Sequence, residues 1–471
     1  MEKEKFLIKN EFVISNETVD ITNPYSSEVV KKVYKTNSEH INVSLDYLTN
    51  IFQKYKKTPA YLKADLLNAI TKKIEHRKED LAYIITLETG KPIKLSRIEV
   101  DRAIFTFQTG AEEARRINGE TIQLDQLKGS EGKFGIIRRF PIGVILAITP
   151  WNFPINLVAH KISPALASGN VILLKPASSS LCCGLEIGKI IKEASEEVGL
   201  DFCPVNVITS SGSEIEKFVS DSRVKMVSFT GSPVVGWNLK KKLNMQKISL
   251  ELGGNAGVIV DDGTDLKIAV SKITIGAFAH AGQSCISVQR VFVHKNIYKE
   301  FEKLLLEETK KIKFGNPFED DTLVGPMINE TEAKRVEQWV KESDGKILFG
   351  GKRNKAVFEP TIISSADMKC NINAKEVFAP LLTLNEFDDF EKAVEEVGNS
   401  DFGLQAGVFT NNIKNAFYAY ENIEVGGVVV NDVPTYRMDS MPYGGTKQSG
   451  IGKEGIKYAI EEMTERKILV L

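Results

Sequence analysis

Residues 143–174 form the stretch GVILAITPWNFPINLVAHKISPALASGNVILL. It opens with the apolar run Gly143–Ile148 and closes with a second run, Asn170–Leu174, and a helical pattern separates the two. Short apolar runs that alternate with helical segments are typical of parallel strands buried on both faces. We therefore predict that this stretch belongs to a parallel β-sheet covered by helices.

The same alternation continues along most of the chain. Further strands of this first series are predicted at Pro204–Ile208, Val224–Phe229 and Lys247–Leu250, with helices such as Leu185–Glu197 and Glu214–Ser220 between them. A second series is predicted to contain strands Gly257–Val260, Val291–Val293, Lys346–Phe349, Ala406–Thr410 and Gly427–Asn431 and helices Leu266–Ala279 and Ile297–Lys311. The predicted fold class is therefore α/β, with two parallel-sheet units in one chain.

Two regions depart from this alternation. Apolar residues recur at helical spacing from about Leu45 to Arg116, which predicts helices before the first sheet. Residues Gly119–Arg139 alternate in polarity and are broken by glycines, a pattern typical of a hairpin arm. The apolar C-terminus, Lys467–Leu471, is predicted to be a strand that pairs with this arm or with another subunit, because an unpaired strand edge needs a partner.

Composition excludes several classes of protein. The chain has 471 residues, too many for one compact core, so we expect two or three domains. A formal net charge of −1 argues against a nucleic-acid partner. The apolar runs are far shorter than a membrane span, so we expect no membrane association and a cytoplasmic location. Five cysteines without a Cys-x-x-Cys pair, and five scattered histidines, argue against disulfides and against a metal site.

Cys285 is the candidate nucleophile. It follows Ala281-Gly282-Gln283-Ser284, a run without bulky apolar residues, so its sulfur is not expected to be packed into a core. The alternative is a buried structural cysteine, the role that we assign to the other four. An accessible thiol can form a covalent intermediate with a carbonyl compound. His280 is near enough in sequence to pair with the thiol, although the spacing does not require it.

Two polar residues at predicted strand ends could serve this thiol. Glu251 ends one strand before Leu252-Gly253-Gly254, and a partly buried carboxylate there can take a proton from water. Asn152 lies in Thr149-Pro150-Trp151-Asn152-Phe153-Pro154, after the first strand, where its amide could stabilise an oxyanion. A solvated loop acid and an Asn turn between prolines are the alternatives. The pattern indicates an enzyme that oxidises or hydrolyses a carbonyl compound.

Two more strand ends could bind a nucleotide. Lys175-Pro176 follows the second strand, where the ammonium could bond ribose hydroxyls, or could simply lie on the surface. Phe229-Thr230-Gly231-Ser232-Pro233 ends the fourth strand, and Gly236 follows at the predicted start of a helix. Backbone N–H groups there can hold a pyrophosphate, although this is not the Gly-x-Gly-x-x-Gly fingerprint.

Together these motifs resemble the aldehyde dehydrogenase superfamily over essentially the whole chain. The matching segments, in their shared order and spacing, are Asn23-Pro24, Thr149–Pro154, Lys175-Pro176, Phe229–Ser232, Glu251–Gly254, Gly282–Cys285, Glu376–Pro380, Phe402–Leu404, Met441–Lys447 and Ser449-Gly450. Val433–Lys447 and Cys285–Arg290 are most similar to archaeal lactaldehyde dehydrogenases.

The resemblance implies a non-acylating, NAD(P)-dependent aldehyde dehydrogenase. Cys285 would be the nucleophile and Glu251 the general base, and Asn152 with the Cys285 backbone N–H would form the oxyanion hole. The thiolate would attack the aldehyde to give a thiohemiacetal, and hydride transfer would leave a thioester. Water activated by Glu251 would then release the carboxylic acid.

The resemblance also implies a set of cofactor-binding residues. They are Thr149, Trp151, Lys175, Ser178, Phe229, Thr230, Gly231, Ser232, Gly236, Leu252, Glu376 and Phe378. Lys175 is expected at the adenosine ribose, Gly231-Ser232 at the pyrophosphate, and Glu376 with Phe378 at the nicotinamide ribose and ring. Ser178 stands where NAD-preferring relatives often have Glu, so we predict that NADP, or either coenzyme, is used.

For the substrate, the resemblance favours a small hydroxyaldehyde such as lactaldehyde. Ser284 precedes the cysteine, whereas some relatives place there an Arg that clamps an anion. His160 and Arg437 are the candidate substrate contacts, while Arg102 and Arg290 are expected to form structural or surface salt bridges. The alternative is a small anionic aldehyde clamped by Arg437: succinate semialdehyde, phosphonoacetaldehyde or glyceraldehyde 3-phosphate.

Three other functions remain as alternatives. A coenzyme A-acylating relative usually lacks the acid at position 251, a plain thiol hydrolase would need no nicotinamide, and a non-catalytic structural relative would have lost the residues named above. The resemblance divides the chain into a cofactor-binding domain (1–118 and 140–250), a catalytic domain (251–440) and an oligomerisation arm (119–139 and 456–471). It implies a homodimer or homotetramer.

Overall fold

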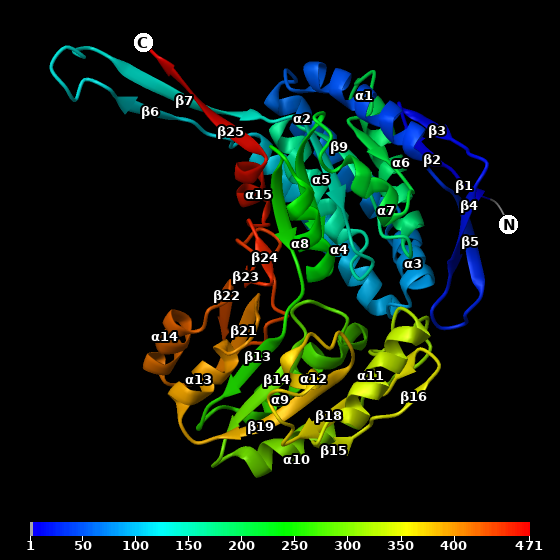
Figure 1. Cartoon of the computed structure of the whole chain (residues 1–471), viewed down its shortest axis with the longest axis vertical. Coiled ribbons are helices and arrows are strands. Elements are labelled where there is room, and N and C mark those ends of the chain that lie inside the picture. The colour runs from blue at the N-terminus through cyan, green and yellow to red at the C-terminus, as the bar shows by residue number, and fades with distance from the viewer. Residues whose placement is uncertain (1–2) are drawn as a thin grey trace.

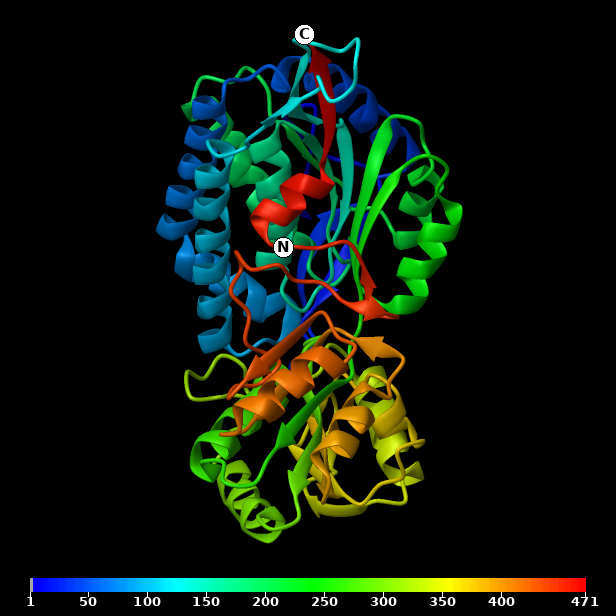
Figure 2. The same ribbon diagram turned by 90° about the vertical axis from the view of Figure 1, so that its left-hand side faces the viewer.

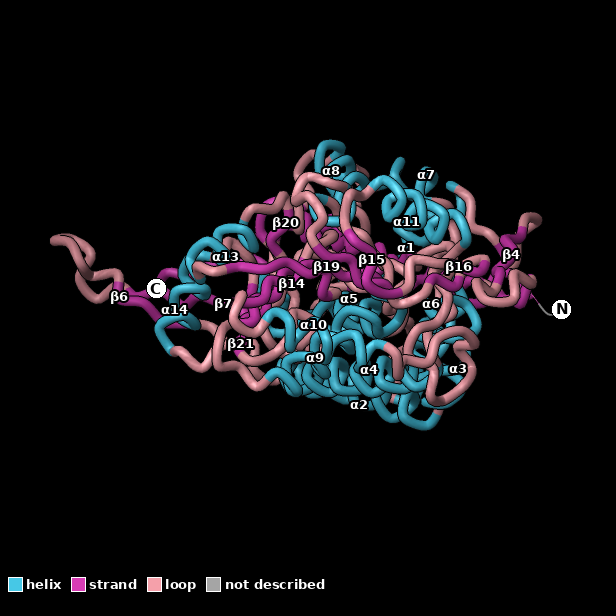
Figure 3. Tube along the Cα trace, turned by 90° about the horizontal axis from the view of Figure 1, so that it is seen from below, coloured by secondary structure: helices cyan, strands magenta, loops and turns pink. Residues whose placement is uncertain are grey.

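Two β-sheets, joined by the link 252–255, form the two lobes of the molecule, and a thin arm projects from one of them (Figure 1). The computed structural model describes residues 3–471. Seen from below, the strands form a layer between two layers of helices (Figure 3). The predicted α/β fold with parallel sheets is confirmed.

The first sheet has eight strands in the order β24-β12-β11-β8-β9-β10-β2-β3. Their bounds are β2 (Phe6–Ile8), β3 (Glu11–Val13), β8 (Val144–Ile148), β9 (Val171–Lys175), β10 (Val205–Val207), β11 (Val224–Thr230), β12 (Lys247–Glu251) and β24 (Gly450–Ile451). The five central strands are parallel, and β8 pairs with β9 so that Val144 lies opposite Val171. Every residue of β8 and β9 is buried, because helices cover both faces of the sheet.

Ten helical segments of the described part of the chain belong to this lobe. They are α1 (Ser38–Tyr55), α2 (Ala60–His76), α3 (Lys78–Thr89), α4 (Ile93–Ala114), α5 (Asn156–Ser168), α6 (Leu181–Glu197), α7 (Gly212–Ile215), the 3-10 turn η1 (Glu216–Phe218), α8 (Pro233–Lys242) and α15 (Ile456–Glu462). Helix α5 connects β8 to β9, and all of its residues are buried. It therefore carries His160 and Lys161 into the interior.

The predicted helix Glu214–Ser220 differs from the structure. Helix α7 ends after one turn and continues only as η1, so a regular helix does not form there. A segment this short makes too few hydrogen bonds to offset the cost of helix nucleation.

The second sheet has seven strands in the order β15-β18-β19-β14-β13-β21-β22. Their bounds are β13 (Ala256–Val260), β14 (Val288–His294), β15 (Lys346–Phe349), β18 (Thr361–Ser364), β19 (Leu381–Phe387), β21 (Gln405–Phe409) and β22 (Gly427–Val430). The helices around it are α9 (Leu266–Phe278), the 3-10 turn η2 (Ala279–Gly282), α10 (Tyr298–Thr309), α11 (Glu330–Glu342), α12 (Asn371–Ala374), α13 (Phe390–Gly398) and α14 (Ile413–Asn422). All neighbouring strands pair in parallel except β15 with β18.

The arm is a third sheet, in the order β25-β7-β6. Its strands are β6 (Glu120–Gln123), β7 (Phe134–Pro141) and β25 (Thr464–Val470). The C-terminal strand pairs with the hairpin so that Ile468 lies opposite Ile137, which is the first of the two predicted pairings. Figure 2 shows β25 extending away from the lobe to the C-terminus.

Smaller pairings complete the chain. One sheet joins β1 (Lys3–Glu4), β5 (Val29–Tyr34) and β4 (Thr18–Thr22), and two-stranded pairs join β16 (Arg353–Asn354) to β17 (Val357–Phe358) and β20 (Phe402–Gly403) to β23 (Thr446–Lys447). Within residues 3–471 no helix is long and apolar enough to cross a membrane.

Candidate active site

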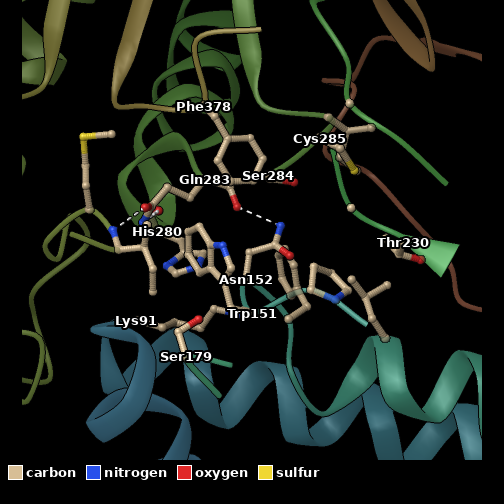
Figure 4. A pocket seen from close by; sticks show the side chains of 18 of the residues that line it. Lys91, Trp151, Asn152, Ser179, Thr230, His280, Gln283, Ser284, Cys285 and Phe378 are labelled. Atoms are coloured by element: carbon tan, nitrogen blue, oxygen red, sulfur yellow. Dashed lines mark hydrogen bonds between the residues drawn. The ribbon is translucent and has the colours of Figure 1, made fainter. Parts of the chain in front are cut away.

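A cavity of about 950 Å³ lies between the two sheets. The carboxyl ends of β11 and β12 reach it from the first sheet, and the segments that precede β14 and β19 reach it from the second. Of the predicted site residues, those that line it are Trp151, Asn152, Ser178, Thr230, Gly231, Ser232, Glu251, Leu252, Cys285, Glu376, Phe378 and Arg437. Those outside its lining are Thr149, His160, Lys175, Phe229 and Gly236. Figure 4 shows Cys285, Asn152, Trp151 and Phe378 around this cavity.

The loop before Cys285 has an unusual backbone. His280 and Ala281 both have φ of 54°, and Gly282 follows with φ of 64°. A Cβ on Gly282 would lie 2.1 Å from the carbonyl oxygen of Ala379, so only glycine fits there. Left-handed conformations at non-glycine residues cost energy and are kept where the surrounding structure imposes them. The loop is thus held in one shape just before the thiol.

The Cys285 side chain lines the cavity and also packs against a small apolar cluster that contains Ile286 and Leu404. The residue is partly buried, and its sulfur lies 3.3 Å from the hydroxyl of Tyr443. Burial raises the pKa of the Cys285 thiol to about 12. His280 does not pair with the thiol: it is buried against the rings of Trp151 and Phe153, and no described residue is a hydrogen-bond partner of its ring nitrogens.

The Asn152 side chain is tied to the same loop. Its Nδ2 donates to the carbonyl oxygen of Gln283 over 3.0 Å. Gln283 in turn donates to the carbonyls of His280 and Pro326 and accepts from the N–H of Ile328. An amide nitrogen has two hydrogens, so one N–H of Asn152 remains for a ligand.

Glu251 is a buried carboxyl without a hydrogen-bond partner. It ends β12, is 3% exposed, and no described residue bonds either of its oxygens. The backbone of Gly444 approaches it so closely that a Cβ there would lie 2.8 Å from Oε1. Burial first, and then the neighbouring Glu454, raise the pKa of Glu251 well above its ordinary value.

The neighbouring carboxylate, Glu454, has the opposite environment. It accepts hydrogen bonds from Arg437 Nη2 over 2.8 Å and from Lys161 Nζ over 3.4 Å. Burial alone would raise its pKa, but Lys161 and Arg437 lower the pKa of Glu454 to about 2. The pKa values of two neighbouring carboxyls are thus shifted in opposite directions.

Asp439 forms a second ion-paired centre beside this one. Arg102 donates to both of its oxygens, over 2.7 and 3.0 Å, and His160 Nε2 lies 2.7 Å from Oδ1. Burial first, and then Arg437, lower the pKa of His160, so its ring is neutral at physiological pH. The predicted ion pair of Arg102 is present, whereas Arg290 is buried and bonds only backbone carbonyls.

The comparison with known proteins agrees with this geometry. A family model described as "Aldehyde dehydrogenase family" matches residues 12–469. The chain is 43% identical to a 3-sulfolactaldehyde dehydrogenase of Priestia aryabhattai, over 98% of this chain and 97% of that one. It is 38% identical to a lactaldehyde dehydrogenase of Methanococcus aeolicus, over 97% and 98% of the two chains.

A solved structure is similar over the same length. It is the glyceraldehyde-3-phosphate dehydrogenase of Methanocaldococcus jannaschii complexed with NADP, with a TM-score of 0.93 and 38% identity, covering 97% of this chain and all of that one. The chain belongs to the aldehyde dehydrogenase family. The predicted family and enzyme class are confirmed.

The cofactor side of this aldehyde dehydrogenase offers groups that fit a nicotinamide dinucleotide. Lys175 is buried, no described residue accepts a hydrogen bond from its ammonium, and burial lowers its pKa to about 8. Ser232 is the N-cap residue of α8, but its side chain makes no capping hydrogen bond. The first turn of that helix contains no acidic residue. A helix N-terminus with free donors is suited to a pyrophosphate.

Glu376 is positioned by two glycines of the link between the sheets. Its Oε1 accepts the N–H of Gly254 over 2.9 Å, and a Cβ on Gly253 would lie 2.4 Å from Oε2. Burial raises the pKa of Glu376 to about 7. A carboxyl that lines the cavity with one oxygen engaged can accept from a ribose hydroxyl with the other.

Several residues of this site had no role in the sequence-based prediction. They are Lys91, Lys161, Gln283, Tyr443 and Glu454. Tyr443 lies in the matching segment Met441–Lys447, so its place near the site was indicated, but its contact with sulfur was not. Lys161 has a weaker signal: it is a cation in the apolar stretch between two buried strands.

Proposed function

We propose that this chain oxidises a small hydroxyaldehyde to its carboxylic acid with NADP⁺ or NAD⁺, using Cys285 as nucleophile and Glu251 as general base. The observation that carries the proposal is that the Cys285 thiol, the Asn152 amide and the Glu251 carboxyl line one cavity. The N-terminus of helix α8, which is suited to a pyrophosphate, lies beside them. Membership of the family supports the same chemistry.

In the first half of the reaction, the chain binds and polarises the aldehyde. The Cys285 thiol loses its proton to water, and the sulfur attacks the carbonyl carbon so that a C–S bond forms. The carbonyl electron pair moves to oxygen, where the free N–H of Asn152 and the backbone N–H of Cys285 stabilise it. When bound, an oxidised nicotinamide supplies the hydride acceptor that turns this adduct into a thioester.

In the second half, Glu251 releases the product. Its carboxylate takes a proton from a water molecule, whose oxygen attacks the thioester carbon. The C–S bond breaks, sulfur leaves as the thiolate, and the carboxylic acid departs. Both oxygens of Glu251 are buried without a partner among the described residues, so the carboxyl can turn toward that water without breaking a hydrogen bond.

For the cofactor, we infer that NADP is accepted. Ser178 and Ser179 line the cavity near the end of β9, where an acid would repel a 2′-phosphate. The Methanocaldococcus relative is complexed with NADP. Efficiency, as kcat/KM, is expected to be similar for the two coenzymes or higher with NADP, and a preference of several orders of magnitude for NAD would contradict this inference.

For the substrate, charge favours an aldehyde with an anionic tail. Around Asp439 and Glu454, the three cations Arg102, Arg437 and Lys161 face these two carboxylates. Arg102 and Arg437 line the cavity, and no described residue accepts a hydrogen bond from Arg102 Nη1. A spare positive charge with free N–H donors fits a sulfonate, carboxylate or phosphate.

The experiment is an aldehyde panel with both coenzymes. We expect kcat/KM for 3-sulfolactaldehyde or glyceraldehyde 3-phosphate to exceed that for lactaldehyde by about tenfold or more, the effect of one charge-assisted hydrogen bond. Arg102→Gln should erase the preference, whereas Arg97→Gln, in the same helix but outside the cavity, should not. Equal or better turnover of lactaldehyde would favour the neutral substrate of the Methanococcus relative.

The nucleophile is tested in the same assay. Cys285→Ala should abolish both coenzyme reduction and ester hydrolysis. Retained coenzyme reduction in this variant would refute the mechanism.

A further inference from the structure

The hydroxyl group nearest the candidate nucleophile is that of Tyr443, 3.3 Å from the sulfur. Tyr443 is 3% exposed and belongs to a small apolar cluster with Ile286 and Leu404, against which Cys285 packs. Tyr443 also lines the cavity, and among the described residues the sulfur is the hydrogen-bond partner of its hydroxyl.

The phenol is held rigidly in place. Tyr443 and Glu454 exchange two backbone hydrogen bonds, over 3.1 and 2.6 Å. The guanidinium of Arg437 lies over the Tyr443 ring, 3.7 Å from its centroid, and donates a hydrogen bond to Glu454. A donor fixed before the reaction needs no reorganisation when charge develops beside it.

We propose that Tyr443 is a catalytic residue, whose O–H donates to the Cys285 sulfur and stabilises it as the attacking thiolate. The tyrosine keeps its proton throughout, and Arg437 above the ring strengthens the donor by its positive charge. This inference rests on the proposed function, in which Cys285 is the nucleophile.

The remaining charges around the pair do not replace this donor. The carboxyl groups of Glu251 and Glu376 raise the pKa of the Cys285 thiol, because a negative charge on either disfavours the thiolate. The cations Lys161 and Lys453 act on Glu251, and Lys161 is bonded to Glu454. Arg437 affects both the phenol and the thiol. Its guanidinium lies over the Tyr443 ring, and its positive charge lowers the pKa of the phenol and of the Cys285 thiol.

The hydrogen bond has an independent consequence for thiol reactivity. Burial raises the pKa of Cys285, and the Tyr443 hydroxyl acts in the opposite direction. Removing that hydroxyl should raise the pKa of the thiol further, so less thiolate is present at any pH below it.

The test is the pH dependence of Cys285 alkylation by iodoacetamide, a neutral reagent, in the full-length protein. Labelling is read at the Cys285 peptide by mass spectrometry, because Cys370 is also partly exposed. Tyr443→Phe should slow alkylation about tenfold or more at each pH from neutral to mildly alkaline, because a smaller fraction of the thiol is ionised. Tyr436→Phe, a half-exposed tyrosine of the same segment that does not line the cavity, should alkylate like the unaltered protein.

A second measurement keeps the test valid if packing changes. The ultraviolet absorbance of the thiolate, taken as the difference from Cys285→Ala, should titrate at higher pH in Tyr443→Phe, with unchanged thermal unfolding. An unshifted titration in a Tyr443→Phe protein, while Cys285→Ala is inactive, overturns the role of the phenol and leaves the proposed function intact. An active Cys285→Ala variant overturns the proposed function itself.

Discussion

At the scale of single residues, two buried carboxyls set the chemistry through their surroundings. Glu454 is ionised because Lys161 and Arg437 bind it, whereas Glu251 has no hydrogen-bond partner in residues 3–471 and is protonated more easily. Burial favours the neutral form of an acid, and the charge of a neighbouring carboxylate adds to that effect. Glu251 can thus act as a base only when it has lost a proton that its site tends to retain.

This arrangement predicts a pH dependence for product release. The pKa of Glu251 is raised, so the carboxylate fraction, and with it kcat, should increase as pH rises from mildly acidic to mildly alkaline. Stopped-flow coenzyme reduction separates the steps, because the burst reports attack by the thiol and the steady phase reports deacylation. A steady phase that is flat across this range, while the burst accelerates, would contradict the role of Glu251.

The sequence alone indicated the site residues that belong to recognisable motifs, but not the residues that contact them in the structure. Cys285, Glu251 and Asn152 were proposed from local context, and the structure brings all three to one cavity. The bond from Asn152 to Gln283 and the contact of Tyr443 with sulfur join distant segments. Such contacts depend on how the two lobes meet, which no local pattern encodes.

At the scale of elements, the link between the sheets positions the cofactor side of the cavity. Gly253 leaves room for the Glu376 carboxyl, since a Cβ there would lie 2.4 Å from Oε2. A glycine that allows such close approach has a positional function beyond flexibility.

Gly253→Ala is therefore expected to displace Glu376. The KM for NADP should rise about tenfold or more, the effect of one lost hydrogen bond to a charged group, while thermal stability changes little. Coenzyme titration of steady-state rates measures this. Gly398→Ala is the matched control, because nothing lies within 4 Å of its added Cβ. Equal KM values in the two variants would show that Glu376 does not contact the coenzyme.

The elements themselves were largely predictable because their burial is uniform. β8 and β9 are apolar along their whole length, as central parallel strands must be, and both were predicted within one or two residues. The region 214–220 was not predicted correctly, because a short amphipathic run alone does not distinguish a helix from isolated turns.

At the scale of the whole molecule, the arm leaves apolar surface uncovered. Ile468, Leu469 and Val470 of β25 are 45%, 57% and 52% exposed although their backbones pair with β7. A contiguous patch of exposed apolar side chains marks an interaction surface. We propose that the arm, 119–139 and 456–471, joins subunits into a homodimer or homotetramer, beside the proposed cofactor-binding (1–118, 140–250) and catalytic (251–440) domains.

Leu469→Asp should therefore weaken the subunit contact and make the oligomer dissociate. Sedimentation velocity is expected to show a smaller species than for the unaltered protein, because burying a carboxylate in an apolar contact is costly. Lys467→Gln, two residues earlier on the same face of the strand, should sediment unchanged. An unaltered oligomer in Leu469→Asp would place the interface elsewhere.

In the proposed mechanism, Cys285 carries the substrate as a thioester that Glu251 helps to hydrolyse. Mixing Glu251→Gln with aldehyde and NADP⁺ should give one coenzyme reduction per active site, followed by arrest, and intact-protein and peptide mass spectrometry should find the acyl group on Cys285. Continued turnover at the unaltered rate, or an acyl group absent from Cys285 after the burst, would contradict it.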